Sequence, residues 1–228
     1  MSSSSFSVAF TGGEAPSPER CRVLAEGAEY IVAADSGLIA CEEAGLRPHL
    51  IVGDMDSLEE AGGLERLARY PPESVRRYQR DKDFTDTELA LDALRELGAK
   101  FIRLIGGGGG RLDHLLAVRE LFERPFFPVT WHTRNENIYA LEPDGEPLVT
   151  KFKTECGGTV SLLPAGDGPW IIESEGLKWA VTNLEWKRGV FGICNIAPEG
   201  SFLLTVRKGR FLLILPHKDQ GIATTAVP

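Results

Sequence analysis

The feature of this sequence that most limits its fold is a change of hydrophobic periodicity near residue 134. Before this point, short apolar runs alternate with segments of helical period, an order typical of parallel strands connected by helices. After it the helical period is lost, and short β-rich stretches are separated by turn sequences that contain Gly and Pro. We therefore predict an α/β part with a mostly parallel open sheet and helices on both faces, followed by a small antiparallel β-sandwich.

The length of 228 residues allows one large domain or two small ones. The change of period predicts two domains, residues 1–134 and 135–228. The strands expected in the first domain are Ser7–Thr11, Tyr30–Ala34, Leu50–Val52, Ser74–Tyr78, Phe101–Ile105 and Val129–His132. Those expected in the second include Thr159–Leu163, Ser201–Val206 and Phe211–Leu215.

Two helix starts are marked by their capping residues. Ser17 followed by Pro18 is typical of an N-cap with proline at the first helical position. Thr85 and Glu88 have the spacing of a capping box, and apolar residues recur at helical spacing behind them. The pattern predicts a helix over residues 85–97.

Composition excludes several classes of protein. With 43% hydrophobic and 25% charged residues the chain is typical of a globular protein. The net charge of −8 argues against a nucleic-acid partner. No apolar run approaches the roughly 20 residues of a spanning helix, and the start lacks a signal pattern, so we expect a cytoplasmic protein without a membrane partner. The cysteines and histidines are scattered without metal-ligand spacing, which argues against a structural zinc site.

Aspartates collect at the C-terminal ends of the predicted strands, where open α/β sheets bind ligands. Asp35 follows the second strand, Asp54 and Asp56 follow the third, and Asp86 closes an acidic segment after the fourth. Any one of these could simply form a turn. Three acidic segments at one edge repel one another without a cation, and Mg²⁺ prefers carboxylate and phosphate oxygens. The sequence therefore predicts a shared Mg²⁺ site.

A run of five glycines, Gly106–Gly110, follows the fifth predicted strand. Glycine lets the backbone approach a phosphate closely, and a helix that begins near Arg111 directs free N–H groups at it. The run matches neither standard nucleotide-binding fingerprint. Arg111 is a candidate phosphate ligand or a solvated helix-start arginine, and Asp113 either caps the helix or orients Arg111. We expect His114 to be packed or hydrogen-bonded rather than a base.

Five short motifs occur in an order that resembles the thiamine pyrophosphokinase family. They are Ala34-Asp35-Ser36-Gly37, Gly53-Asp54-Met55-Asp56-Ser57, Asp81-Lys82-Asp83-Phe84-Thr85-Asp86, Gly109-Gly110-Arg111-Leu112-Asp113-His114 and Gly176-Leu177-Lys178-Trp179. The resemblance extends from the first strand to about Leu215. It implies transfer of the diphosphate of ATP to the hydroxyethyl group of thiamine, giving thiamine diphosphate and AMP. It also implies a homodimer, with residues 1–134 as the nucleotide- and metal-binding catalytic domain and residues 135–228 as the thiamine-binding domain.

The resemblance also implies roles for individual residues. The metal ligands would be Asp54, Asp56 and Asp86, which with Arg111 form the catalytic group. The nucleotide and phosphate contacts would be Asp35, Gly37, Lys82, Thr85, Gly109 and Asp113. The thiamine contacts would be Trp179, Cys194 and Asn195. Two departures from the family pattern affect substrate affinity: Cys194 stands where bacterial members commonly have serine, and Lys82 stands where some members have glutamine.

Two other function classes fit parts of the pattern. Another Mg²⁺-dependent nucleotide phosphoryl- or nucleotidyl-transferase could use the same carboxylates and glycines. A non-catalytic sensor of thiamine or a nucleotide is the second alternative, although it has no need for carboxylates at three strand ends. Trp179 is the candidate for stacking on the cationic thiamine ring, with ordinary packing as its alternative.

Overall fold

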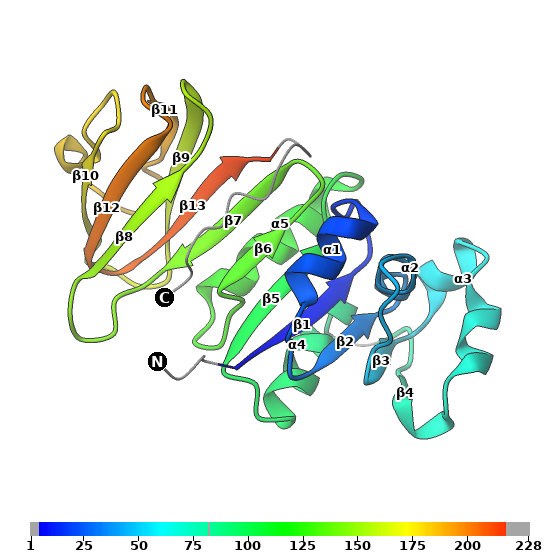
Figure 1. Ribbon diagram of the computed structural model, residues 1–228. Helices are drawn as coiled ribbons and strands as arrows, with labels where there is room; N and C mark the ends of the chain where they lie inside the picture. Colours follow the sequence, from blue (N-terminus) through cyan, green and yellow to red (C-terminus); the bar gives the residue numbers. More distant parts are fainter. Residues whose placement is uncertain (1–4, 82, 218–228) are drawn as a thin grey trace. The chain divides into compact units, whose positions relative to one another are not determined.

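The computed structural model describes residues 5–81 and 83–217 (Figure 1). Lys82, a predicted nucleotide contact, lies outside the described residues. The chain divides into two compact units. The first contains the chain up to Leu121 together with Phe126–Arg134, and the second contains Phe122–Pro125 and the chain from Asn135 on.

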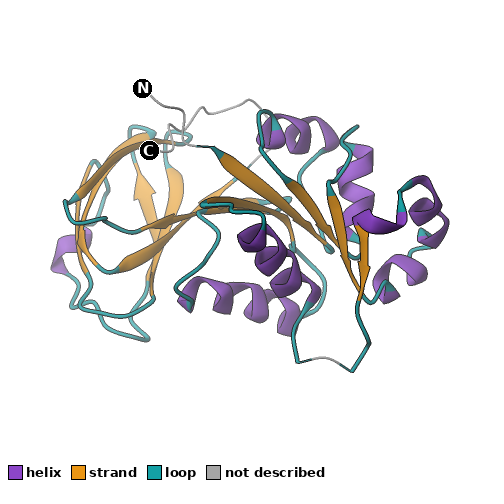
Figure 2. Ribbon diagram, turned by 90° about the horizontal axis from the view of Figure 1, so that it is seen from below, coloured by secondary structure: helices purple, strands orange, loops and turns teal. Residues whose placement is uncertain are grey.

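The first unit is built on a parallel sheet with the strand order β6-β5-β1-β2-β3-β4. The strands are β1 (Phe6–Thr11), β2 (Ile31–Ala34), β3 (Leu50–Gly53), β4 (Val75–Arg77), β5 (Phe101–Gly106) and β6 (Thr130–His132). Each of them overlaps a strand predicted from the sequence. Strands β1, β2 and β3 are buried along nearly their whole length, as parallel strands are when helices cover both faces of the sheet. Figure 2 shows helices on both faces of this sheet.

The helices connect the strands in the predicted alternating order. They are α1 (Pro18–Ala25), α2 (Gly37–Glu43), α3 (Asp56–Glu60), α4 (Asp86–Glu96) and α5 (Leu112–Glu120), with 3₁₀ turns at Leu64–Arg69, Pro72–Ser74, Leu121–Glu123 and Val181–Asn183. Both predicted caps are confirmed: the Ser17 side chain accepts from the backbone N–H of Arg20, and Thr85 and Glu88 form the capping box of α4. None of the helices in the described residues is long and apolar enough to cross a membrane.

The second unit contains two antiparallel sheets, with the strand orders β11-β9-β13-β7 and β10-β12-β8. The strands are β7 (Glu136–Leu141), β8 (Leu148–Lys153), β9 (Gly158–Ala165), β10 (Ile171–Glu175), β11 (Gly192–Ala197), β12 (Ser201–Lys208) and β13 (Arg210–Pro216). Inward-facing residues of both sheets form one apolar core, with Phe152 stacked on Phe202 and Trp186 edge-on to Phe211. The predicted order of an α/β part followed by an antiparallel β part is confirmed.

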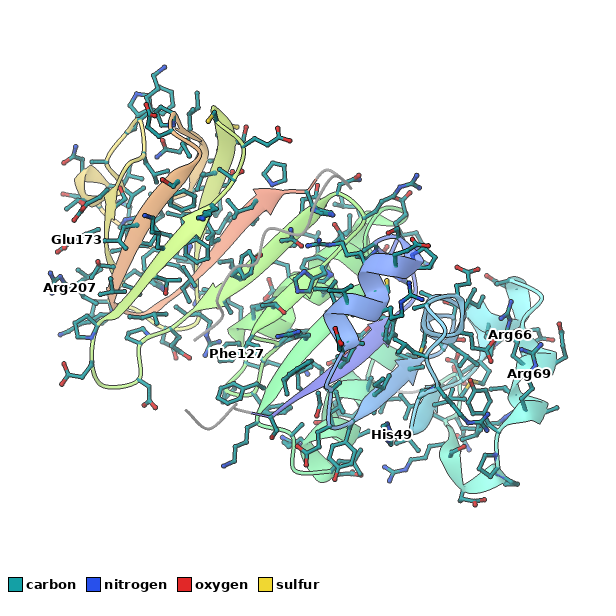
Figure 3. The ribbon with its side chains drawn as sticks, in the orientation of Figure 1. His49, Arg66, Arg69, Phe127, Glu173 and Arg207 are labelled. Atoms are coloured by element: carbon teal, nitrogen blue, oxygen red, sulfur yellow. The ribbon has the colours of Figure 1, made fainter. Side chains whose placement is uncertain are left out.

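Two arginines of the second unit have contrasting surroundings. Arg207 lies on the surface, where it forms two hydrogen bonds with Glu173 of the neighbouring strand (Figure 3). Arg210 is almost fully buried and donates to the carbonyl oxygens of Phe122 and Arg124 and to the carboxylate of Glu142. Since these carbonyls belong to residues 122–125, the arginine attaches this short segment to the β-rich unit.

Removal of a core side chain tests the packing of the second unit. We expect Phe211→Ala to lower the free energy of unfolding by about 3–5 kcal/mol, because it leaves a cavity where a fully buried ring packs against Trp186. Urea unfolding followed by tryptophan fluorescence measures this change. Val149→Ala, at an exposed position of β8, is the control and should change stability by less than about 0.5 kcal/mol. Equal effects of the two substitutions would contradict the assigned core.

Candidate active site

Three aspartates from separate segments of the first unit meet at one edge of its sheet. Asp35 follows β2, Asp54 follows β3 and Asp86 begins α4. Their carboxylate oxygens lie within 4.8 Å of one another, which is close enough for one metal ion to be bound by all three. The structure thus brings together three of the four aspartates singled out in the sequence.

Asp35 connects two of the loops at this edge. It is 4% exposed, and its two carboxylate oxygens accept hydrogen bonds from the backbone N–H groups of Ser57, at 3.0 Å, and Leu58, at 2.8 Å. Burial raises the pKa of Asp35 above its ordinary value, the two backbone hydrogen bonds oppose this shift, and the charges of Asp86 and Asp54 add to it. A cation at the cluster would stabilise the charged form of all three carboxylates.

The loop after β3 has an unusual backbone that allows the carboxylates to converge. Gly53 has a φ of +140°, and a Cβ atom there would lie 3.0 Å from Asp86 Oδ1 and 3.2 Å from Asp35 Cβ. Met55 is buried and has a φ of +71°, a conformation that is uncommon for a residue with a side chain. Such strain is typical of functional sites, where the surrounding structure maintains it.

Asp56 lies outside this cluster. Its carboxylate contacts the guanidinium group of Arg80, and its backbone N–H donates to Asp54 Oδ1 at 3.2 Å. The sequence places Asp54 and Asp56 two residues apart, which would point them the same way in an extended segment. The left-handed Met55 between them breaks that extended geometry.

A cleft of about 500 Å³ opens beside the three aspartates. Its walls come from the loops after β1, β2, β3 and β5, from the start of α4 and from one side of α5. The lining includes Thr11, Gly12, Gly13, Asp35, Ser36, Asp54, Ser57, Arg80, Phe84, Thr85, Asp86, Thr87, Gly107–Gly110, Arg111 and His114. The carboxylates and the glycine run of the sequence therefore face the same space.

The backbone conformation of the glycine run is fixed by contacts with the neighbouring loop and strand. Four of its five glycines have positive φ values, as backbone without side chains readily allows. The backbone N–H of Gly107 donates to the carbonyl of Gly12 at 2.9 Å, and Trp131 Nε1 donates to the carbonyl of Gly106 at 2.7 Å. A Cβ atom at Gly109 would lie 2.7 Å from the Glu14 side chain. The run lines the cleft with backbone alone.

Arg111 is the N-cap residue of α5, and its guanidinium group is oriented by Asp113. Arg111 Nε and Nη2 donate to the two carboxylate oxygens of Asp113 at 3.1 and 2.6 Å. These hydrogen bonds hold the pKa of Asp113 below its usual value. Of the two sequence interpretations of Asp113, the structure therefore supports the one in which it orients Arg111. His114 is exposed on the cleft wall, which excludes the packed alternative, and the expectation that it is not a base stays a prediction.

The other predicted nucleotide contacts differ in position. Thr85 caps α4. Both Thr85 and Gly109 line the cleft. Gly37 is buried, and a Cβ atom there would lie 2.5 Å from the carbonyl oxygen of Phe10, so glycine is needed for α2 to pack on β1. In the described part of the chain, Gly37 is not among the residues that line the cleft.

Several lining residues were not found by sequence reasoning. Thr11 and Thr87 are buried and share a hydrogen bond of 2.6 Å between their hydroxyl groups at the cleft. Arg80 lines the cleft two residues before the described part of the chain is interrupted at position 82. Thr11 carries a signal that could have been used, because it ends the first predicted strand immediately before Gly12 and Gly13. The sequence gives no such signal for Arg80, since a lone arginine in a polar loop is common.

A second pocket, of about 520 Å³, lies within the β-rich unit. Trp179, which is 53% exposed, lines it together with the exposed apolar residues Phe191 and Ile193. Asn195 fixes the tryptophan backbone: its side chain accepts from the N–H of Trp179 at 3.2 Å and donates to the carbonyl at 2.7 Å. Trp179 is thus presented to solvent rather than packed in the core.

Cys194 adjoins this pocket. It is exposed, has a φ of +58°, and lies where the pairing of β11 with β9 is irregular. Its backbone N–H donates to the Ser161 hydroxyl oxygen at 3.2 Å. The residue is not among those that line the pocket in the described chain, whereas Asn195 is.

Comparisons with known proteins indicate the family of this chain. A family model described as thiamin pyrophosphokinase, catalytic domain, matches residues 21–128. The thiamine pyrophosphokinase of Bacillus subtilis (strain 168) is 36% identical over 157 residues, which are 67% of this chain and 70% of that protein. Among solved structures, the thiamin pyrophosphokinase of Geobacillus thermodenitrificans has a TM-score of 0.68 at 25% identity, covering 94% of this chain and 99% of the other.

The Bacillus subtilis thiamine pyrophosphokinase structure has a TM-score of 0.73 at 20% identity over 94% of this chain and 99% of the other, which supports the same fold. The resemblance carried by the five sequence motifs is thereby confirmed. The 36% identity over about two thirds of both chains, together with the match to the family model, shows that this chain belongs to the thiamin pyrophosphokinase family.

Proposed function

We propose that the chain is a magnesium-dependent thiamine pyrophosphokinase whose cleft in the first unit binds ATP. The family assigns the enzyme class, and the observation that carries the site is the convergence of three carboxylates beside a backbone-lined glycine loop. In the proposed reaction the hydroxyl oxygen of thiamine forms a bond to the β-phosphorus of ATP and releases its proton. The bond from that phosphorus to the oxygen shared with the α-phosphorus breaks, and AMP leaves.

The carboxylate cluster has the donor chemistry that Mg²⁺ requires. Oxygen ligands suit this hard cation, and the three carboxylates approach one another closely enough to share it. We propose Asp54 and Asp86 as ligands. Asp35, whose oxygens already accept two backbone hydrogen bonds, adds negative charge beside them. Bound there, Mg²⁺ supplies positive charge that stabilises the transferred phosphates. The resemblance implies Asp56 as a third ligand, but its carboxylate contacts Arg80, so we leave it out of the proposed ligand set.

The remaining residues of the cleft bind and orient the phosphates. Backbone N–H groups of Gly107–Gly110 can donate to phosphate oxygens, since no side chain blocks their approach. Arg111 adds a charged donor whose planar group matches a phosphate, and Asp113 fixes its direction before the substrate arrives. Such preorganised donors stabilise charge in the transition state with little rearrangement.

We further propose that the pocket of the β-rich unit binds thiamine. The exposed Trp179 ring supplies a flat surface for the cationic thiazolium or the pyrimidine ring, and Asn195 holds the tryptophan backbone in place. Cys194 is proposed as an adjacent contact. The family resemblance implies a homodimer, and light scattering of the purified protein measures this directly: a mass of twice 24.9 kDa is expected.

Replacement of one proposed ligand tests the metal site. We expect Asp54→Asn to reduce Mg²⁺-dependent formation of thiamine diphosphate about 100-fold or more, because it removes a charged ligand. Its thermal unfolding midpoint should not fall, since one of three mutually repelling carboxylates becomes neutral. The assay follows thiamine diphosphate and AMP together. Release of ADP or free pyrophosphate by the wild-type protein would instead indicate a kinase or a nucleotidyltransferase.

Asp92→Asn is the matched control for this experiment. Asp92 is partly exposed on α4, where it pairs with Arg95 one turn away, and it does not line the cleft. Its replacement should leave activity within about twofold of the wild-type value. Wild-type activity of Asp54→Asn would refute the ligand assignment.

Replacement of the exposed tryptophan tests the thiamine pocket. We expect Trp179→Ala to raise the Michaelis constant for thiamine about tenfold, because stacking on a cationic ring is lost, and to leave that for ATP unchanged. Trp179→Phe should retain part of the affinity. Val149→Ala, an exposed apolar position of the same unit outside the pocket, should change neither constant. An unchanged Michaelis constant for thiamine in Trp179→Ala would eliminate the stacking role.

A further inference from the structure

The cleft has a second arginine besides Arg111. Arg80 lies between β4 and α4 and lines the same space as Asp54 and Thr85. Its Nε group contacts Oδ2 of Asp56. Among the described residues that line the cleft, the aspartates are Asp35, Asp54 and Asp86, and the arginines are Arg80 and Arg111. Arg80 therefore supplies half of the arginine charge on that lining.

We propose that Arg80 binds the phosphates of the nucleotide and that Asp56 is the positioning residue that directs it toward the cleft. This inference rests on the proposed function, since it takes ATP as the ligand.

The charge of the cleft favours this role for Arg80. A nucleoside triphosphate adds several negative charges to a space that already contains three carboxylates. A divalent cation compensates only part of this charge, so the phosphates need further cations from the chain. A guanidinium group is always charged and presents donors in a plane that matches two phosphate oxygens. Arg80 lines the cleft beside the three carboxylates and so can supply a further positive charge for the phosphates.

The two arginines of the cleft are arranged alike. Each contacts an aspartate that is not among the described lining residues: Asp113 for Arg111 and Asp56 for Arg80. In both pairs the arginine lines the cleft and the aspartate does not. An arginine that is already oriented loses less side-chain freedom when it binds a phosphate.

Solvent exposure limits how firmly Asp56 holds Arg80. Its side chain is 69% exposed and that of Asp56 is 31% exposed, and ion pairs in such solvent contact contribute little to stability. The contact uses Nε, whereas a guanidinium group has five N–H donors. Arg80 can therefore turn its Nη groups to a phosphate at small cost while its Nε keeps the contact with Asp56.

The test measures nucleotide binding without turnover. The probe is α,β-methylene-ATP with Mg²⁺, because the bond that the proposed reaction breaks is replaced in this analogue. Isothermal titration should give a dissociation constant about tenfold or more higher for Arg80→Gln than for wild type, and an intermediate value for Arg80→Lys. In steady-state assays the Michaelis constant for ATP should rise while that for thiamine stays unchanged. The salt dependence of analogue binding should also become weaker.

Arg76→Gln is the matched control, because Arg76 lies on β4 and pairs with Glu96 outside the cleft. It should bind the analogue within twofold of wild type. Arg80→Gln with wild-type affinity overturns the role of Arg80, as does a loss of the same size in Arg76→Gln. If Arg80→Gln fails to fold, wild-type affinity of Arg80→Lys together with an unchanged salt dependence overturns it.

The proposed function has a separate readout. A wild-type protein that binds the analogue through Arg80 but forms no thiamine diphosphate from ATP and thiamine would refute the proposed reaction and leave the role of Arg80 standing. If the wild-type protein forms thiamine diphosphate while Arg80→Gln binds the analogue with wild-type affinity, the role of Arg80 is refuted and the proposed reaction stands.

Discussion

The mutual repulsion of three carboxylates is the constraint on which the first unit depends. Asp35, Asp54 and Asp86 are held close together although their charges oppose it, and the burial of Asp35 makes its ionisation still less favourable. Two backbone hydrogen bonds to Asp35 and the close packing at Gly53 maintain this geometry. The fold therefore supplies a preformed negative site whose three carboxylates could bind a metal ion.

The order of the parallel strands explains why these three segments meet. Strands β2 and β3 are neighbours, and α4 begins on the segment that follows β4 next to them. The glycine loop follows β5, on the other side of β1, and the loop after β1 contacts it through Gly12. Ligand sites at the C-terminal edge of such sheets arise because successive strands deliver their loops to the same edge. One cleft thus receives acidic residues from one side and bare backbone from the other.

Local sequence signals were sufficient wherever a structure depends on neighbours along the chain. The capping box of α4 and the proline at the start of α1 were predictable because their hydrogen bonds join residues three positions apart. The alternating pattern identified every strand of the first unit. The same signals could not give the interaction of Arg210 with Phe122 and Arg124, since these residues are more than 80 positions apart.

The sequence by itself determined the order of elements, the change from α/β to β, the family, and the aspartates and glycines that face the cleft. Only the tertiary structure decided which of these aspartates lie in the carboxylate cluster and which lies outside it. Asp35 joins the cluster. Asp56 instead contacts Arg80, because the left-handed backbone at Met55 breaks the extended geometry that would point Asp54 and Asp56 the same way. It also decided that Gly37 packs against β1 and that Arg80 lines the cleft. Such outcomes depend on which distant segments become neighbours, and no local spacing encodes that information.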